Sequence, residues 1–559
     1  MIDAQRNAGE VARRAAARKG WRAALGAPLL FLALLAAGLW NLSSPGPWWD
    51  EGWTLTVART YVERGHYGRL LEGQPAPAGL EAAPAVTLPV AALFRALGVG
   101  LWQGRLFGVL CTAAALAFTW LLAARLYDRQ VAWGTIAALL LLPGHPQLNP
   151  LLLGRQVLGE MPLLLWLVAG YACMLAALRR SPLWVAGAAA MWGLALQTKT
   201  QPELFLAVSL AAGAAVSLAL GRRRSAALFA VALGGVYLAR GVIGYLLWGQ
   251  LAGHTLAGQQ LTGLVEVMAF VPQAFNRLYA LQVLLMFGLP TAGALAWALW
   301  REVLALRRGE AGSPEVAVLR WALLALAGSW LAWYTLLSVG VPRYLFPAAY
   351  VGAIFLAALL RDLTGGFDLR ATLERMAAPL RGGRRTHNAG VPGGAADGYD
   401  ERPTPGWSLA LVVGRWSFGA SAGAWLAALI VAAALPLTLL SYQRYYLSSS
   451  DRSAQRVAAL LNERAGPGEL IETYESELHF FLDRPYHYPP DQVHVALNRR
   501  SLLQQDALVS YDPLAADPDY LVVGQFARGN RLYQPALERG AFELLLRDGA
   551  YEVYRRVRR

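Results

Sequence analysis

The chain has little charge for its size, and this excludes an ordinary soluble enzyme. Only 15% of its 559 residues are charged, whereas 56% are hydrophobic and the mean hydropathy is +0.36. Soluble domains carry about a quarter charged residues, so this balance is typical of a protein that crosses a membrane many times.

Cysteine and lysine are also scarce. The two cysteines, Cys111 and Cys173, both lie in apolar stretches, which excludes a disulfide framework, a thiolate metal cluster or a redox pair. Lysine occurs only at Lys19 and Lys199, so arginine carries most of the net charge of +14. The arginines gather in short clusters between apolar runs, a pattern that orients membrane proteins, and we therefore expect no nucleic-acid partner.

Apolar runs and arginine clusters alternate along the chain and predict its topology. Residues 1–23 are basic and should be cytoplasmic, and the first apolar run lacks a convincing cleavage site, so we expect it to remain as a helix. We interpret residues 43–103 as a long external loop with amphipathic helices on the membrane surface. The region from 24 to 441 as a whole predicts about eleven transmembrane helices, with every strong arginine cluster on the cytoplasmic side.

Two further regions differ from the apolar part. Residues 361–407 are rich in Gly and Arg and predict a disordered cytoplasmic loop. Residues 442–559 begin with helical spacing and continue with short β-like runs at 470–474, 520–523 and 551–554. The fold class predicted is a polytopic α-helical membrane protein with a small C-terminal extracytoplasmic α/β domain.

Asp50 and Glu51 are adjacent carboxylates placed just after the first apolar run. Charges at such a position are costly unless water or a partner receives them, so the pair is a candidate site for chemistry. The alternative is a solvated loop, since acids at membrane boundaries are common.

Four more charged residues lie at external ends of predicted helices. Arg155 and Glu160 stand at the mouth of the fourth crossing, where an exposed boundary ion pair is the alternative to a site role. Lys199 lies between two apolar runs, and its compact ammonium group suits binding of a phosphate oxygen. The alternative is a lysine at a helix end whose side chain extends to water. Arg343 suits bidentate phosphate binding, or else it anchors a lipid headgroup.

These residues together indicate transfer of a sugar from a lipid phosphate. A carboxylate removes the proton from an acceptor hydroxyl or amine as that group attacks the anomeric carbon. Lys199 and Arg343 stabilise the charge that develops on the departing phosphate. Such a reaction needs no nucleotide, which suits an extracytoplasmic site.

Several short motifs occur in an order that resembles the GT-C membrane glycosyltransferases of the protein O-mannosyltransferase and aminoarabinose transferase superfamily, which is glycosyltransferase family 39-like. The resemblance covers roughly residues 24–360. The motifs are Asp50-Glu51, Arg105-Leu106-Phe107-Gly108 with Ala124-Arg125-Leu126-Tyr127, Gly159-Glu160-Met161-Pro162, Thr198-Lys199 and Arg343-Tyr344.

The resemblance implies a polyprenyl-phosphate-sugar donor, inversion at the anomeric carbon and Asp50 as the catalytic base. It implies substrate binding by Glu51, Glu160, Lys199, Arg343 and Tyr344, to which the position of Arg155 adds a sixth candidate. The expected enzyme is a hexosyl or pentosyl transferase of the cell envelope, a multi-pass protein of the inner or plasma membrane. Its partners would be membrane lipids, a lipid-linked donor and an extracytoplasmic lipid, glycan or protein acceptor.

The chain departs from this family in one place. Many relatives have a basic residue before paired prolines in the first loop, whereas this chain has Glu81-Ala82-Ala83-Pro84. We therefore expect this chain to differ from those relatives either in the residues that bind the donor phosphate or in the acceptor.

Metal binding is a separate question. A divalent metal is possible in the family, but His254 has no partner ligands and is more typical of a structural histidine, so no metal site is predicted. In the tail, His479, Asp483, Tyr486 and His487 match no metal-binding spacing, and we interpret them as solvated loop residues.

Two other functions fit parts of the pattern. A flippase or transporter of lipid-linked substrates would place its charges near the middle of the membrane, whereas these lie at external helix ends. A membrane anchor for a binding domain would not need so many helices. The donor sugar, the acceptor and the lipid length do not follow from the sequence.

Overall fold

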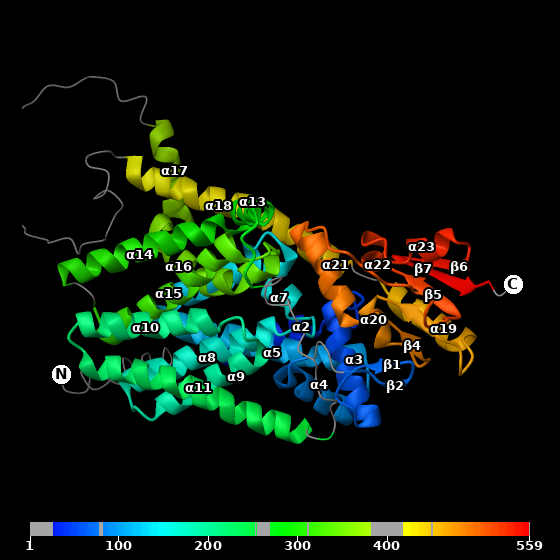
Figure 1. The fold of residues 1–559 in the computed structure, drawn as a ribbon. Helices are drawn as coiled ribbons and strands as arrows, with labels where there is room; N and C mark the ends of the chain where they lie inside the picture. The colour runs from blue at the N-terminus through cyan, green and yellow to red at the C-terminus, as the bar shows by residue number, and fades with distance from the viewer. Residues whose placement is uncertain are drawn as a thin grey trace, which may run out of the picture.

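The computed structural model describes residues 26–77, 82–251, 253, 269–309, 312–381, 418–448 and 451–557. Long helices run side by side as a bundle, and the C-terminal domain lies at one end of it (Figure 1). The bundle helices are α2 (Gly26–Leu39), α5 (Leu101–Leu126), α6 (Arg129–Leu141), α8 (Glu160–Arg179), α9 (Trp184–Thr198), α10 (Glu203–Ala219), α11 (Arg223–Leu251), α13 (Ala274–Val283), α14 (Leu289–Arg308), α15 (Pro314–Leu337), α16 (Pro342–Thr364) and α18 (Phe418–Tyr442).

The polytopic membrane fold is confirmed, but the number of crossings is not. Within the described ranges, seven helices are long and apolar enough to cross a membrane, counting α13 and α14 as one because the π-helical turn η2 (Leu284–Gly288) joins them. The predicted crossings that contain α2, α6, α9 and α10 have shorter helices of 14, 13, 15 and 17 residues.

Small and polar side chains bring the bundle helices together. A Cβ at Gly170 of α8 would lie 2.3 Å from the indole nitrogen of Trp192 on α9, so glycine is what allows this close approach. The same indole donates to the carbonyl of Leu167 at 3.1 Å. Ser209 of α10 contacts the hydroxyl of Tyr171 at 2.5 Å and donates to the carbonyl of Ala322 at 2.6 Å, which links three helices.

The basic ends of several helices lie at the end of the bundle opposite the C-terminal domain. The junction between α10 and α11 is there, and so are the end of α14 and helix α17 (Leu369–Arg381) (Figure 1). Arg223 begins α11, and Arg307 and Arg308 close α14. The bundle thus has a basic end and a domain-bearing end, as the predicted topology requires.

The segment predicted to be a disordered loop is helical in its first part. Helix α16 continues to Thr364 and α17 follows it, so the prediction of disorder is wrong for residues up to 381, while 382–417 lie outside the described residues. Asp368 accepts a hydrogen bond from the backbone of Ala371 at 3.0 Å, and Arg370 pairs with Glu374 one turn later at 3.0 Å. A capped first turn and an i,i+4 ion pair stabilise the helix despite the polar composition.

The first loop contains α3 (Trp49–Arg64), a hairpin of β1 (Leu70–Leu71) and β2 (Gln74–Pro75), and α4 (Pro84–Leu97). We predicted helices lying on the membrane surface, and this is wrong for α3. Its residues Trp49, Trp53 and Val57 pack into a hydrophobic core shared with the C-terminal domain. Pattern alone gives an apolar helix face, but it does not tell whether lipid or protein covers that face.

The C-terminal domain is the predicted small α/β domain. Its five-stranded sheet has the order β4-β3-β5-β7-β6, with the first three strands parallel and the last two added antiparallel. The strands are β3 (Ile471–Thr473), β4 (Tyr486–His487), β5 (Tyr520–Val523), β6 (Phe542–Asp548) and β7 (Tyr551–Arg556). The helices are α19 (Ser453–Arg464), α20 (Ser476–His479), α21 (Asp491–Leu503), α22 (Gln525–Gly529) and α23 (Gln534–Glu538).

Candidate active site

Four of the predicted site residues meet at one cavity of about 180 Å³. Asp50 comes from α3, Glu160 from the start of α8, Lys199 from the end of α9 and Arg343 from the start of α16. Arg343 pairs with Asp50 through Nη1, and Lys199 Nζ lies 2.5 Å from Glu160 Oε1. Arg343 Nε also lies 4.0 Å from the same Glu160 oxygen, so acids and bases alternate around the cavity.

The ends of helices place these charges. Asp50 and Glu160 both stand in the first turn of a helix, where the unpaired backbone N–H groups favour a negative charge. Arg343 follows Pro342, which starts α16 with the backbone angle that a first turn requires. Lys199 is the residue after α9, and its extended backbone turns its side chain out of the helix.

Burial separates the two acids of the cavity. The side chain of Glu160 is 3% exposed, whereas that of Asp50 is 35% exposed. Burial acts to raise the pKa of Asp50, but the neighbouring Arg343 and Lys199 outweigh it and lower the pKa below 3.8. Asp50 is therefore an ionised and accessible carboxylate at neutral pH.

Glu51 does not reach the cavity, although we predicted that it binds substrate. Its carboxylate is fully buried and paired with Arg105, with Nε to Oε1 and Nη2 to Oε2 both 2.7 Å. It also accepts hydrogen bonds from the backbone of Val157 at 3.1 Å and of Trp48 at 3.3 Å. Glu51 thus holds α3 against α5 and against the turn before α8.

Arg155 does not line the 180 Å³ cavity but a second pocket, which Arg343 also lines. Its Nη2 donates to the backbone carbonyls of Asn41 and Ser44, the latter at 3.0 Å, and its guanidinium lies 4.7 Å from the centre of the Tyr446 ring. Burial, together with the nearby Arg105, lowers the pKa of Arg155 to about 10. The pocket, of about 330 Å³, shares Leu158 and Arg343 with the 180 Å³ cavity.

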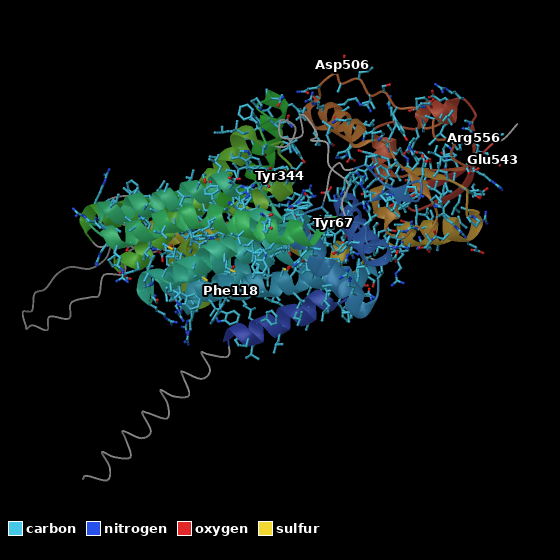
Figure 2. The ribbon with its side chains drawn as sticks, turned by 60° about the horizontal axis from the view of Figure 1, so that its bottom comes forward. Tyr67, Phe118, Tyr344, Asp506, Glu543 and Arg556 are labelled. Carbon is cyan, nitrogen blue, oxygen red and sulfur yellow. The ribbon has the colours of Figure 1, made fainter. Side chains whose placement is uncertain are left out.

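Tyr344 is next to the site without lining either space. Its ring lies 5.7 Å from the Arg343 guanidinium and 6.1 Å from the Trp333 ring. Tyr344 is labelled in Figure 2, in the part of the bundle near the C-terminal domain. The guanidinium of Arg343 lies over this ring, so Tyr344 supports a site residue without lining the cavity.

Comparisons with known proteins show which solved structures share this fold. No family model and no curated protein matches the chain. Among solved structures, the aminoarabinose transferase ArnT from Cupriavidus metallidurans is similar both in the apo state (TM-score 0.57) and bound to undecaprenyl phosphate (0.55), at 15% identity over 95% of this chain and 98% of that one. An Archaeoglobus fulgidus oligosaccharyltransferase tethered with an acceptor peptide has a TM-score of 0.52 at 13% identity, over 96% of this chain and 75% of that one. Both proteins are GT-C glycosyltransferases.

The chain has the GT-C fold.

In this GT-C fold the C-terminal domain closes over the helix that carries Asp50. The Trp49 indole stacks on His494 with ring centres 4.7 Å apart and donates to the Tyr474 carbonyl at 3.0 Å. The Ser476 hydroxyl donates to the Trp49 carbonyl. We did not predict these contacts, because they join residues more than 400 positions apart, and the tryptophan pair beside Asp50 was the only signal.

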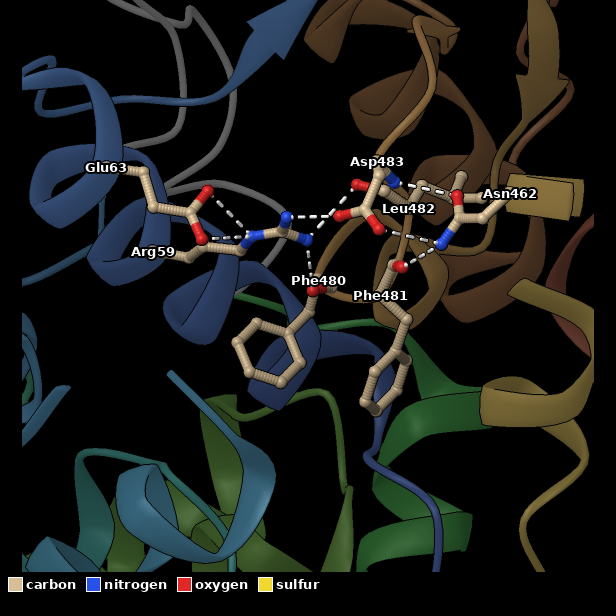
Figure 3. A network of polar contacts seen from close by, with 7 residues as sticks. All are labelled: Arg59, Glu63, Asn462, Phe480, Phe481, Leu482 and Asp483. Atoms are coloured by element: carbon tan, nitrogen blue, oxygen red, sulfur yellow. Dashed lines mark hydrogen bonds and ion pairs between the residues drawn. The ribbon is translucent and has the colours of Figure 1, made fainter. Parts of the chain in front are cut away.

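A second set of polar contacts docks the later turns of α3 (Figure 3). Arg59 donates to the carbonyls of Phe480 at 2.9 Å and Leu482 at 3.1 Å, and it pairs with Asp483 at 2.5 Å and Glu63 at 3.0 Å. Asp483 is therefore an interdomain contact, although its side chain is 64% exposed and so remains solvated as we predicted.

The other tail residues that we interpreted as solvated are also structural. His479 is buried and stacks on Tyr486 at 4.4 Å between ring centres, and His487 Nδ1 lies 2.5 Å from the buried Glu472 carboxylate. In the part of the chain that the structure describes, no three His, Cys, Asp or Glu side chains are grouped so as to hold a metal ion. His254 lies outside the described residues.

Proposed function

We propose that this protein is a membrane glycosyltransferase that moves a sugar, a hexose or a pentose, from a polyprenyl-phosphate donor to an extracytoplasmic acceptor. The observation that carries the proposal is the single cavity lined by Asp50, Glu160, Lys199 and Arg343. It combines an accessible carboxylate with two cations, which are the groups that a displacement at an anomeric carbon needs. The fold shared with ArnT, solved with undecaprenyl phosphate, supports a lipid-linked donor.

Asp50 acts as the base in this mechanism. Its carboxylate accepts the proton of the acceptor hydroxyl while that oxygen forms a bond to the anomeric carbon. The bond between this carbon and the phosphate oxygen breaks, and its electron pair leaves with the polyprenyl phosphate. Attack opposite to the leaving group inverts the anomeric centre.

Arg343 and Lys199 serve the leaving group. Each is paired with a carboxylate of the cavity, Arg343 with Asp50 and Lys199 with Glu160. A donor phosphate competes for these cations and draws Arg343 away from Asp50, which leaves Asp50 free to accept a proton. Glu160 keeps Lys199 in place, because a buried acid in the first turn of α8 is held as an anion.

The pocket of about 330 Å³ suits the head of the lipid donor. Its lining joins apolar residues with the guanidiniums of Arg105, Arg155 and Arg343. Arg343 is shared with the catalytic cavity, so a phosphate held between the two spaces would present its sugar to Asp50. These arginines would bind the donor phosphate in a chain whose first loop has Glu81-Ala82-Ala83-Pro84 and no basic residue before paired prolines.

The test is turnover with defined donors. Purified full-length protein in lipid nanodiscs is incubated with a panel of polyprenyl-phosphate sugars, and release of polyprenyl phosphate is measured. We expect release from at least one donor, and loss of release in Lys199→Ala. Movement of intact donors across vesicle membranes, with no release from any donor, would instead identify a flippase.

A further inference from the structure

A third space opens beside the catalytic cavity, and its volume is about 600 Å³. Its walls are the start of α4, the end of α9 and the end of α11. It shares Ala83, Thr198 and Lys199 with the cavity that contains Asp50. The two spaces therefore adjoin at these three residues.

An exposed tryptophan forms one wall of this space. Trp248 of α11 is 39% exposed, and its ring stands edge-on to Tyr67 with centres 6.1 Å apart. The Tyr67 hydroxyl donates to the Ala82 carbonyl at 2.6 Å, which fixes the chain before α4 (Tyr67 is labelled in Figure 2). The indole is thus held in place while part of its surface stays free to stack on the apolar C–H face of a sugar ring.

The polar groups around Trp248 are neutral or already paired. Arg240 Nη1 lies 2.6 Å from Glu203 Oε2, and Lys199 is paired with Glu160. Between them lie Gln197, Thr200 and Gln201, whose amide and hydroxyl groups both donate and accept hydrogen bonds. Such a lining matches a neutral ligand with many hydroxyl groups.

The pocket of about 330 Å³ that contains Arg155 differs from this space in its charge. Arg155, which lines it, donates to backbone carbonyls and has no carboxylate within ion-pair distance among the described residues. Its positive charge is thus available to an anion, whereas the charges around Trp248 are balanced. Each of the two spaces adjoins the cavity of Asp50. The Arg155 pocket suits an anionic ligand, and the Trp248 space suits a neutral one.

We propose that the acceptor is a saccharide that binds in the Trp248 pocket and directs one hydroxyl past Ala83 to Asp50. This inference rests on the proposed function and adds to it the chemical class of the acceptor. The acceptor oxygen bonds to the donor's anomeric carbon, its proton passes to Asp50, and polyprenyl phosphate leaves with the bonding electron pair. Ala83 has the smallest side chain that a non-glycine residue offers, and a larger one would narrow the passage.

Steady-state kinetics with two varied substrates test this inference. With a donor that wild-type full-length protein turns over, soluble oligosaccharides, peptides and lipid alcohols are offered as acceptors and the glycosylated products are identified. Trp248→Ala should raise KM for a saccharide acceptor about three- to tenfold and leave KM for the donor unchanged, because one ring-stacking contact is lost. Trp248→Phe keeps an aromatic platform and should restore most of the loss.

The matched control is Trp184→Ala. Trp184 is 47% exposed at the first turn of α9, at the other end of the helix whose last residues line the pocket, and it should change neither KM. Transfer only to peptides or lipid alcohols overturns the inference, and so does an effect of Trp248→Ala on the donor KM alone. If wild type releases polyprenyl phosphate from no donor, the proposed function itself fails.

Discussion

Asp50 and Glu51 are neighbours in one helical turn, but they have different surroundings. Consecutive residues of an α-helix point roughly 100° apart, so one carboxylate enters the cavity and the other enters the protein interior. In the cavity Asp50 forms an ion pair with Arg343, and in the interior Glu51 forms an ion pair with Arg105. The charged cavity residues were predictable from their positions at helix ends. The role of Glu51 was not, because its partner lies 54 residues away and sequence does not give the rotation of α3.

Glu51 should act on stability rather than on substrate affinity. We expect Glu51→Ala to destabilise the fold by roughly 3–5 kcal/mol, because it leaves the buried Arg105 charge without a carboxylate. Thermal unfolding of purified protein measures this loss, and the folded fraction should keep the wild-type donor KM. If Glu51→Ala kept wild-type stability but had a raised donor KM, Glu51 would be a substrate-binding residue.

Arg343 should set the pH range in which Asp50 works as a base. The lowered pKa of Asp50 means that its base form is present at neutral pH and is lost only as the pH falls through that lowered value. We expect kcat/KM of wild type to lack an acid limb from Asp50 above about pH 4. In Arg343→Gln the lowering effect of the guanidinium is lost, so burial raises the pKa of Asp50. The acid limb of kcat/KM then moves to higher pH. Parallel pH profiles that differ only in height would show that Arg343 does not tune Asp50.

At the scale of elements, α3 is the part on which the site depends. It has the base in its first turn and lies against the C-terminal domain along much of its length. Hydropathy was enough to predict the bundle helices, and short β-like runs were enough to predict β3, β5 and β7. Hydropathy did not predict that protein covers α3. A helix buried between domains has the same apolar face as a helix that lies on lipid.

Gly52 is where α3 comes closest to the C-terminal domain. A Cβ at this position would lie 2.2 Å from the Glu477 Cα, a backbone atom that cannot move aside alone. We expect Gly52→Ala to push the two elements apart, lower the unfolding temperature and reduce turnover by at least about tenfold, since a small displacement of a base is costly. Gly234→Ala in α11, where nothing lies within 4 Å, is the control and should be neutral or slightly stabilising. Equal behaviour of the two variants would show that this contact does not hold the site.

At the scale of the whole molecule, the C-terminal domain is part of the site's scaffold. Trp49, Arg59 and Gly52 of α3 all contact it, so the position of Asp50 depends on the docking of residues more than 400 positions further along the chain. The existence of this domain was predictable from its strand and helix patterns. Its docking was not, because most of the hydrogen bonds between α3 and this domain end on backbone carbonyls, which every sequence has.

The docked domain should loosen as the pH rises from about 4.5 to about 8. Burial raises the pKa of Glu475 to about 7 and that of Glu477 to about 8, and the two acids stand on either side of Ser476, which bonds to α3. Acids with raised folded pKa values favour the folded state below the ordinary value of 4.5, and this contribution is lost as the pH rises through about 7 to 8. We expect the unfolding temperature to fall as the pH rises from about 4.5 to about 8 and to level off above that range.

Glu477→Gln removes one of these ionisations and should flatten that pH dependence. The fall should be smaller by several degrees in the variant, because a neutral amide needs no proton to stay buried. Glu543→Gln, on the exposed face of β6, is the control and should follow wild type. A fall of the same size in all three proteins would show that other groups cause the pH dependence of stability.

The central claim is that Asp50 is the base of a sugar transfer from polyprenyl phosphate. The most direct measurement is the rate of polyprenyl phosphate release by Asp50→Asn with a donor that wild type turns over, after thermal unfolding has shown that the variant is folded. The account predicts a loss of about 10²–10⁴-fold, since the amide cannot accept the acceptor's proton. Unchanged release by a folded Asp50→Asn variant would contradict it.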